Sequence, residues 1–468
     1  MSYFVKERDR APAVTTPIPT DVSLPRTCVI GAGASGLAAV KALHQAAVPV
    51  DCFEQGSIVG GNWVFANPNG QSACYETLEI NTSCPRMAFS DFPMPSDYPA
   101  YARHDQVADY FEAYVDHFGF RERIRFNTRV DEVIPENGGW KVAITGPDGT
   151  EEHNYDAVLV ANGHHWDARW PEPAYPGNFA GEQLHAHDYR SAEQLKERNV
   201  VVVGAGNSAL DIASEAGRVA HSAVLSQRRG QWVLRKYFLG WASDQLVLPK
   251  WLPWWATRAR LRLASILSGS TTRLGLPHPT HAPGQSHPVQ SEQIRRMLKV
   301  GAVTPKPGIE RLHGDQVVFT DGSATAADLI IWATGYRVRF PFLSEDLVNP
   351  AGNELPLWKR TVHPDHPGLF FIGLLQPIGA VMPLAEAQSL WVTEMLTGSY
   401  LAPPEATIRT QMERDQQRNA RRFYASARHT MEVDFDSYLW DLERERRRGS
   451  ARASQSAARS RIHQGVTA

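Results

Sequence analysis

Two glycine-rich turns constrain the fold of this chain more than any other feature. The segments 31–36 (GAGASG) and 204–209 (GAGNSA) each follow a short apolar run and precede a stretch with helical spacing. A strand, a turn of this kind and a helix together form the start of a dinucleotide-binding βαβ unit. Two such units predict an α/β protein with two Rossmann-like domains.

The first unit runs from the strand 27–30 through a helix over 37–47 to the strand 50–53. Gly31 allows the tight turn, Gly33 lets the backbone approach a pyrophosphate, and Gly36 lets the helix pack on the strand. The helix N-terminus, with Ala34 and Ser35, supplies amides and a partial positive charge for phosphates. Glu54 ends the second strand, close to the ~20-residue offset at which an acid accepts hydrogen bonds from ribose hydroxyls.

The second unit differs from the first after its second strand. Gly204, Gly206 and Ala209 match GxGxxA, and a helix is predicted from about Asn207 to Arg218. The next strand ends in Gln227-Arg228-Arg229 rather than in an acid. Because a guanidinium pairs with a 2′-phosphate, this ending favours NADPH over NADH. The alternative is that the two arginines form only a solvated charge pair.

Bulk properties exclude several classes of protein. The chain has 468 residues, which favours two or three domains, and its net charge of −2 provides no field for nucleic acid. The four cysteines form no CxxC pair, so neither a redox dithiol nor a zinc site is predicted, and a reducing cytoplasm fits best. The histidines of segment 278–288 lack metal-ligand spacing, so no metal is expected. No stretch reaches the ~20 apolar residues of a membrane helix.

The order of the predicted elements suggests a domain inserted within another. The first nucleotide domain is expected over 24–165 and again over 319–442, with its first sheet closed by the strand at 155–161. The second is expected over 166–318, with a helical insert at about 238–300. The insert is rich in tryptophan; packing is favoured over contact with a membrane surface or a substrate channel. The termini, 1–23 and 443–468, are expected to be flexible because the tail has few large apolar residues.

One loop between the two turns carries a further pattern. Phe179, Gly181, His185 and Tyr189 spell FxGxxxHxxxY. Together with the two turns, Asn81-Thr82-Ser83 followed by Asp91-Phe92-Pro93, and Ala333-Thr334-Gly335-Tyr336, this resembles the flavin-containing monooxygenases (class B flavoprotein monooxygenases). The resemblance runs from about Thr27 to about Leu442.

The resemblance implies that the first turn binds FAD and the second binds NADPH. It implies that Asn81 faces the reactive C4a region of the flavin, with His185 and Tyr189 as further candidate catalytic residues. The alternative is a purely structural role, in which Asn81 is a turn residue whose side chain caps its own loop. The expected cofactor contacts are Gly31, Gly33, Ala34, Ser35, Gly36, Glu54, Gly61, Asn62, Trp63, Asn81, Thr82, Gly204, Gly206, Asn207, Ser208, Ala209, Arg228, Arg229, Thr334 and Gln376.

The implied reaction uses a small organic substrate and O2. NADPH reduces FAD, O2 adds to form a C4a-hydroperoxyflavin, and a soft nucleophile, an amine nitrogen or a sulfide sulfur, takes up one oxygen atom. The side-chain amide of Asn81 both donates and accepts hydrogen bonds, which suits this role. His185 could act as an acid or base, but ordering of the inter-domain loop together with Tyr189 is the favoured interpretation.

Two departures from the family pattern refine this prediction. Tyr189-Arg190 replaces the Trp-Pro of Baeyer–Villiger relatives, which favours N- or S-oxygenation over ketone oxygenation. The polar C-terminus replaces a hydrophobic anchor, which predicts a soluble, cytoplasmic protein with no transmembrane anchor. Baeyer–Villiger oxygenation, NADPH oxidation with release of H2O2, a disulfide reductase and a non-catalytic flavoprotein remain as alternatives. The oligomeric state stays open, a homodimer being one option.

Overall fold

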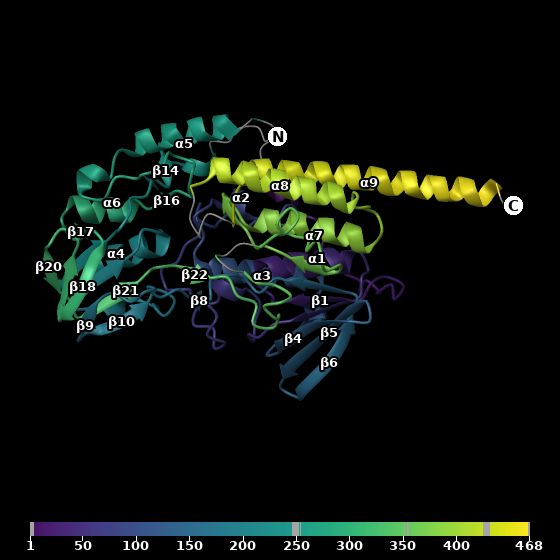
Figure 1. Cartoon of the computed structure of the whole chain (residues 1–468), viewed down its shortest axis with the longest axis horizontal. Helices are drawn as coiled ribbons and strands as arrows, with labels where there is room; N and C mark the ends of the chain where they lie inside the picture. Colours follow the sequence, from purple (N-terminus) through teal and green to yellow (C-terminus); the bar gives the residue numbers. More distant parts are fainter. Residues whose placement is uncertain are drawn as a thin grey trace.

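The structure is a computed structural model that describes residues 4–245, 252, 254–350, 352, 355–424 and 431–466, with side chains as far as residue 458. Two parallel sheets organise it, and Figure 1 shows them at opposite ends of the molecule. Each sheet carries one of the two glycine-rich turns. The prediction of an α/β fold with two dinucleotide-binding domains is therefore confirmed.

The first sheet has the strand order β23-β7-β1-β2-β3, and all its pairs are parallel. Its strands are β1 (Thr27–Ile30), β2 (Val50–Phe53), β3 (Ile124–Arg125), β7 (Ala157–Val160) and β23 (Leu369–Phe371). Strand β7 lies inside the sheet, so the prediction that it closes the sheet was wrong; β23, from the far end of the chain, forms that edge. Helices α1 (Ala34–Gln45), α3 (His104–Phe118) and α7 (Met382–Leu396) pack over this sheet.

The second sheet has the order β10-β21-β11-β12-β17 and is also parallel throughout. Its strands are β10 (Glu182–His185), β11 (Asn199–Val203), β12 (Ser222–Ser226), β17 (Thr304–Lys306) and β21 (Leu329–Trp332). Helix α4 (Asn207–Val219) follows β11, and α6 (Glu292–Lys299) packs against α4. A smaller sheet adjoins it, shares a hydrophobic cluster with it and has the order β20-β19-β18-β9. Its strands are β9 (Gly177–Phe179), β18 (Ile309–Gly314), β19 (Gln316–Phe319) and β20 (Ala324–Ala326).

The antiparallel piece attached to the first domain consists of β4 (Arg129–Glu136), β5 (Gly139–Gly146) and β6 (Gly149–Tyr155). Ile124–Arg125, which precedes it in the chain, is not part of this piece and pairs with β2 at the edge of the parallel sheet.

The two domains are joined by two crossings that run side by side. The outgoing crossing contains β8 (Asp167–Ala168) and the returning one contains β22 (Tyr336–Arg337), and these strands pair antiparallel. Because β21 belongs to the second sheet, the chain returns to the first domain after Trp332 and not at residue 319 as predicted. The nested order of the domains is as predicted.

The insert in the second domain lies between β12 and β17. It contains the pair β13 (Val233–Leu234) and β16 (Val289–Gln290), the hairpin β14 (Tyr237–Phe238) and β15 (Trp241–Ala242), and helix α5 (Trp254–Ser268). Trp251, one of its tryptophans, lies outside the described residues. Leu234 of β13 and Leu261 of α5 pack in one hydrophobic cluster with Ile378 and Phe423, so the insert lies against the C-terminal part of the first domain.

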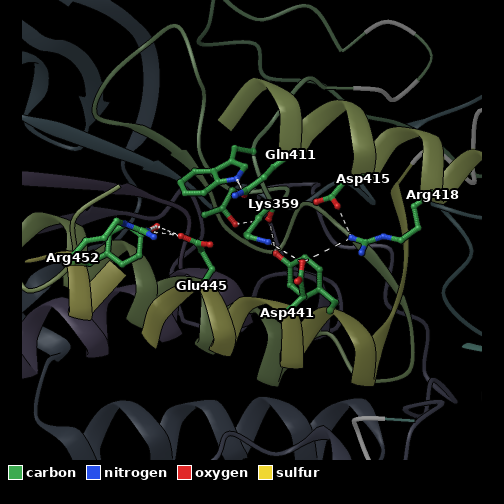
Figure 2. Close-up of polar contacts among 11 residues, drawn as sticks. Lys359, Gln411, Asp415, Arg418, Asp441, Glu445 and Arg452 are labelled. Atoms are coloured by element: carbon green, nitrogen blue, oxygen red, sulfur yellow. Dashed lines mark hydrogen bonds and ion pairs between the residues drawn. The ribbon is translucent and has the colours of Figure 1, made fainter. Parts of the chain in front are cut away.

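The C-terminal segment is not flexible as predicted; it forms the long helix α9 (Phe435–Val466). Figure 2 shows the polar contacts that tie α9 to α8 (Glu405–Arg422) and to the turn before β23. The Lys359 ammonium lies 2.8 Å from Asp441, and the Tyr438 hydroxyl donates to the Lys359 carbonyl at 2.6 Å. Arg452 pairs with the buried carboxylate of Glu445 at 2.6 Å. Composition missed the part of this helix from residue 443 onward because ion pairs such as Arg446–Glu394, rather than large apolar side chains, hold it.

The N-terminal segment also differs from its predicted flexibility. Its backbone amides at Val5, Ala11 and Val14 donate to the carbonyls of Pro85, Asp91 and His117 at 2.8, 2.8 and 2.9 Å. It therefore runs along the first domain as an ordered strap. No helix in the described part of the chain is both long enough and apolar enough to cross a bilayer.

Candidate active site

A cavity of about 1460 Å³ lies between the two parallel sheets, at the carboxyl ends of their strands. Both glycine-rich turns, the loop that carries Asn81, the two inter-domain crossings and the insert contribute to its lining. In open α/β sheets ligands bind at this edge, because the turns that follow parallel strands gather there. The fold thus brings together segments that are more than 300 residues apart.

The first turn forms a cradle with little room for side chains. Gly31 has φ +98°, and a Cβ there would lie 2.9 Å from the Ala161 carbonyl oxygen. A Cβ on Gly36 would lie 1.8 Å from the Gly31 carbonyl oxygen, so helix α1 reaches the turn only because this position has no side chain. Gly33 and Gly61 face one another across the cradle, with a Cβ on Gly61 falling 3.1 Å from the Gly33 Cα. The two backbones thus approach closely at the start of α1, and a helix N-terminus without side chains in front of it fits a pyrophosphate.

Glu54 closes the cradle from the end of β2. Its Oε2 accepts from the Ala32 amide at 2.7 Å and its Oε1 from the Gly56 amide at 2.6 Å. Burial raises the pKa of Glu54 above its ordinary value, and these two amides lower it. Each carboxylate oxygen retains a second acceptor position, so the side chain orders the turn and remains able to accept from ribose hydroxyls.

The second turn is built on the same plan with a looser helix contact. A Cβ on Gly204, where φ is +151°, would lie 2.4 Å from the Ala333 carbonyl oxygen. Ala209 occupies the third glycine position of the motif and is fully buried. Helix α4 begins at Asn207, whose Oδ1 accepts from the Gln290 amide of the insert at 3.3 Å.

Two arginines stand where an acid would follow β12. Arg228 and Arg229 are exposed and line the cavity directly after Ser226, while Gln227 between them and the strand is buried. Gly308 packs against Arg228, since a Cβ there would lie 3.4 Å from the arginine Cβ. A cavity edge with two exposed guanidinium groups fits the 2′-phosphate of NADPH.

The loop that carries Asn81 lies between the two turns. Asn81 is half-buried and lines the cavity with Thr82, and the Ile80 amide just before it donates to the Ala102 carbonyl at 2.9 Å. Asn62 and Trp63 reach the same cavity from a short 3-10 turn, where Asn62 Oδ1 accepts from the Ala73 amide at 2.9 Å. The loop is anchored at both ends, so Asn81 presents its amide from an ordered backbone.

His185 sits at the end of β10, against the cavity wall. It is 1% exposed, and its Nδ1 accepts from the His187 amide at 3.0 Å. Its ring contacts those of Trp170 and Tyr336, one from each crossing. Burial, and next the neighbouring His187, lower its pKa to about 4. The ring is therefore neutral near pH 7 and orders the crossings.

Tyr189, the last residue of the FxGxxxHxxxY pattern, does not line the cavity. It is fully buried, and its hydroxyl donates to Glu215 Oε2 of α4 at 2.6 Å. The Thr77 hydroxyl donates to the other oxygen of Glu215. This geometry makes Tyr189 a structural link rather than a group at the reacting atoms.

A set of polar contacts around Tyr189 was not predicted. The Tyr75 hydroxyl donates to Asp211 Oδ2 at 2.7 Å, and burial raises the pKa of Asp211 to about 6. Asp211 and Glu215 stand one turn apart on α4 and together bind the segment that leads to Asn81. Acids four residues apart on a helix are typical of a solvated face, so the sequence offered no signal for this role.

The structure brings most of the predicted site residues to one cavity. The lining includes Gly31, Gly33, Ala34, Ser35, Glu54, Gly61, Asn62, Trp63, Asn81, Thr82, His185, Gly204, Gly206, Asn207, Ser208, Ala209, Arg228, Arg229, Thr334 and Gln376. Gly36 and Tyr189 lie behind it. Their common position along one cavity supports the predicted group of site residues, while the role of each residue stays a prediction.

Comparison with known proteins agrees with this architecture. The family model described as "Flavin-binding monooxygenase-like" matches residues 25–446. Flavin-containing monooxygenase 5 of Oryctolagus cuniculus is 33% identical over 429 residues, covering 88% of this chain and 80% of that protein. Flavin-containing monooxygenase 2 of Homo sapiens is 30% identical over 448 residues, covering 89% and 82%.

Solved structures share the fold. S-allyl-L-cysteine S-oxygenase from Allium sativum superposes with a TM-score of 0.68 at 24% identity, covering 93% of each chain. Cyclohexanone monooxygenase from Rhodococcus sp. Phi1, bound to NADP+, gives a TM-score of 0.66 at 16% identity, covering 94% of this chain and 98% of that one. Family match, relatives and fold agree: this chain belongs to the flavin-binding monooxygenase-like family and is an FAD-containing, NADPH-dependent monooxygenase.

Proposed function

We propose that this monooxygenase oxygenates the nitrogen or sulfur of a small amine or thioether, with Asn81 as the protein group at the reacting centre. The observation that carries the proposal is the position of Asn81 on an ordered loop between the two nucleotide cradles. Bound FAD supplies the activation of O2, since no protein side chain provides that chemistry. The first cradle fits FAD because the glycine-rich turn leads directly into the N-terminus of α1, which suits a pyrophosphate, and Glu54 can accept from its ribose.

The protein's own side chains hold and orient the groups bound in the cavity and shield them from water. Asn81 offers both a donor and an acceptor to groups in the cavity. Arg228 and Arg229 hold the NADPH phosphate at the far wall, and His185 and Tyr189 keep the crossings and α4 in register. The neutral, buried His185 excludes water from the wall and transfers no proton in this proposal.

The preference for a soft nucleophile rests on the end of the FxGxxxHxxxY loop. Arg190 turns back on that loop, and its guanidinium donates to the His187 and Tyr189 carbonyls at 2.5 and 3.1 Å. The Trp-Pro ending of Baeyer–Villiger relatives has no donor at that position. Ketone oxygenation is the alternative, and both an S-oxygenase and a cyclohexanone monooxygenase share this fold.

Product analysis with NADPH, O2 and a panel of amines, thioethers and cyclic ketones tests the proposal. We expect N-oxide or S-oxide formed in step with NADPH consumption and little H2O2. In Asn81→Ala we expect FAD to be retained and the oxygenated share of consumed NADPH to fall by about 10²-fold, the lower end of the effect of losing one positioned polar group. Lactone from the ketones alone, or H2O2 alone from the wild type, would overturn it.

Two variants serve as controls. Asn162 also lines the cavity and donates from Nδ2 to the Arg339 carbonyl at 3.1 Å, so Asn162→Ala should leave the product share unchanged. Tyr189→Phe should also keep the product share. A direct proton transfer by Tyr189 would instead lower turnover by about 10² or more. A cytoplasmic location and a homodimer stay predictions alongside this proposal.

A further inference from the structure

The base of the β14–β15 hairpin in the insert lies directly against the loop that carries Asn81. Asp244, just after the hairpin, accepts from the Ser83 amide through Oδ2 at 2.7 Å. Lys236, just before it, places its ammonium 2.9 Å from Glu79 Oε2. Glu79 and Ser83 stand two residues before and two residues after Asn81. The insert therefore holds the loop on both sides of the proposed reacting residue.

The hairpin base is itself a closed unit. The Ser243 amide donates to the Lys236 carbonyl at 2.8 Å, and the Tyr101 hydroxyl donates to the same carbonyl at 2.8 Å. Tyr101 and Tyr237 meet edge to face, with ring centroids 5.3 Å apart and an interplanar angle of 89°. The contacts at Lys236 and Asp244 share this base, so they belong to one hydrogen-bonded unit of the insert rather than to two separate surface contacts.

The same base is joined to the second glycine-rich turn through Gln290. The Gln290 amide donates to Asn207 Oδ1 at 3.3 Å, and its side-chain Nε2 donates to the Ser243 hydroxyl at 3.3 Å. Asn207 is the first residue of α4 and lines the nucleotide cavity. A continuous series of hydrogen bonds thus links the NADPH turn, through Gln290 and the hairpin base, to the loop of Asn81.

We propose that Asp244 is a positioning residue for Asn81, acting through the Ser83 amide, and that the hairpin base sets the Asn81 loop according to whether the second nucleotide turn is occupied. The inference rests on the function proposed above for Asn81. Ser83 is fully buried, so its amide has no access to bulk water if the carboxylate is removed. A charged acceptor makes the stronger kind of amide hydrogen bond, which suits a loop that must hold one side chain in place.

Hydrogen–deuterium exchange of the FAD-bound enzyme over residues 79–84, with and without NADP+, tests the inference without turnover. In the wild type, NADP+ should slow exchange of this segment. In Asp244→Ala the slowing should be lost, and the oxygenated share of consumed NADPH should fall by about fivefold or more, the lower bound of a typical coupling between sites. Asp244→Asn keeps an acceptor oxygen without the charge and should restore most of both readouts relative to Asp244→Ala.

A matched control is Asp328→Ala. Asp328 accepts from the Asn199 amide through Oδ2 at the same distance of 2.7 Å, but at the amino ends of β11 and β21, away from the cavity. Equal behaviour of Asp244→Ala and Asp328→Ala, or failure of Asp244→Asn to restore the readouts, would overturn the inference. If Asp244→Ala does not fold, Lys236→Met removes the other contact, the ion pair with Glu79. It should shift both readouts in the direction expected for Asp244→Ala, and an absence of any shift would also overturn the inference.

The two proposals fail in different ways. A wild type that forms no oxygenated product removes the proposed function, while the exchange measurement still reports whether NADP+ acts on residues 79–84. An active wild type whose exchange over 79–84 ignores NADP+ removes the positioning role of the hairpin and leaves the proposed function standing.

Discussion

The two nucleotide-binding units share one motif but differ in how their first helices are packed. In α1 every residue from Gly36 to His44 is buried, because the first sheet covers one side and α7 the other. In α4 burial is less complete, since Asp211 is half-buried and Arg218 is exposed. The third motif position is Gly36 in the first unit and Ala209 in the second, so the first helix approaches its turn more closely. We infer a fixed cradle for FAD and an accessible one for NADPH, which must exchange in each cycle.

The largest expected effect comes from adding one methyl group to the tighter cradle. In Gly36→Ala the Cβ would meet the Gly31 carbonyl oxygen at 1.8 Å, and this oxygen belongs to the backbone of the turn, which cannot swing away as a flexible side chain would. We expect purified protein without flavin absorbance, and a loss of about 1–3 kcal/mol or more in unfolding free energy. Absorbance near the flavin band and thermal unfolding measure these outcomes.

Gly33→Ala is the matched comparison. Its Cβ would lie 3.7 Å from the Gly61 Cα, an ordinary contact, so folding should be preserved while FAD binding weakens. Retention of FAD by Gly36→Ala would show that α1 can shift, and the contrast between the two cradles would then be wrong.

The second expected effect concerns the accessible cradle. Arg228→Ala removes an exposed cation at the cavity edge, and loss of a charge-assisted contact of about 1.5–3 kcal/mol corresponds to roughly a 10- to 150-fold higher KM for NADPH. The KM for NADH should change little, because that nucleotide lacks the 2′-phosphate. Steady-state kinetics with both nucleotides check this. An equal loss for NADH, or a larger effect in Arg229→Ala, would assign the phosphate elsewhere.

The smallest expected effect is a pH dependence at the packed helix pair α1–α7 behind the first glycine-rich turn. Glu386 of α7 is buried beside the Lys41–Asp91 ion pair and accepts from the Ser90 amide at 2.8 Å. Burial, and next the nearby Asp91, raise its pKa from 4.5 to about 7. The folded state therefore binds this proton more tightly than the unfolded chain, and the stability it contributes is lost as pH rises from 4.5 through 7.

Glu386→Gln tests that sign. Glutamine keeps an acceptor for the Ser90 amide and cannot ionise, so its unfolding temperature relative to the wild type should rise as pH increases from 5 to 8. If the difference in unfolding temperature between variant and wild type is the same at every pH, Glu386 ionises in the folded protein without loss of stability. The α1–α7 interface would then be more open to water than the burial of Glu386 indicates.

Local signals determined much of this protein. The two turns, their helices and the missing acid after β12 could be predicted because each depends on residues close together in the chain, where glycine, helix spacing and strand length have direct steric meaning. The nested order of the domains followed from the same turns, and most of the predicted cofactor contacts lie along one cavity because parallel strands end at a common edge. The FxGxxxHxxxY pattern indicated the family. It did not predict that its last residue, Tyr189, binds Glu215 of α4.

Only the tertiary structure decided which polar groups meet across the domains. Tyr75 and Asp211 are 136 residues apart, and Ser83 and Asp244 are 161 apart, so no local pattern joins them. The order of α9 likewise depends on Lys359, 82 residues away from Asp441. A buried hydrogen bond of this kind is specified by the positions of two distant backbones, which the packing of both sheets sets. The sequence by itself therefore identified the two nucleotide-binding turns. The tertiary structure decided which hydrogen bonds connect the segments around them.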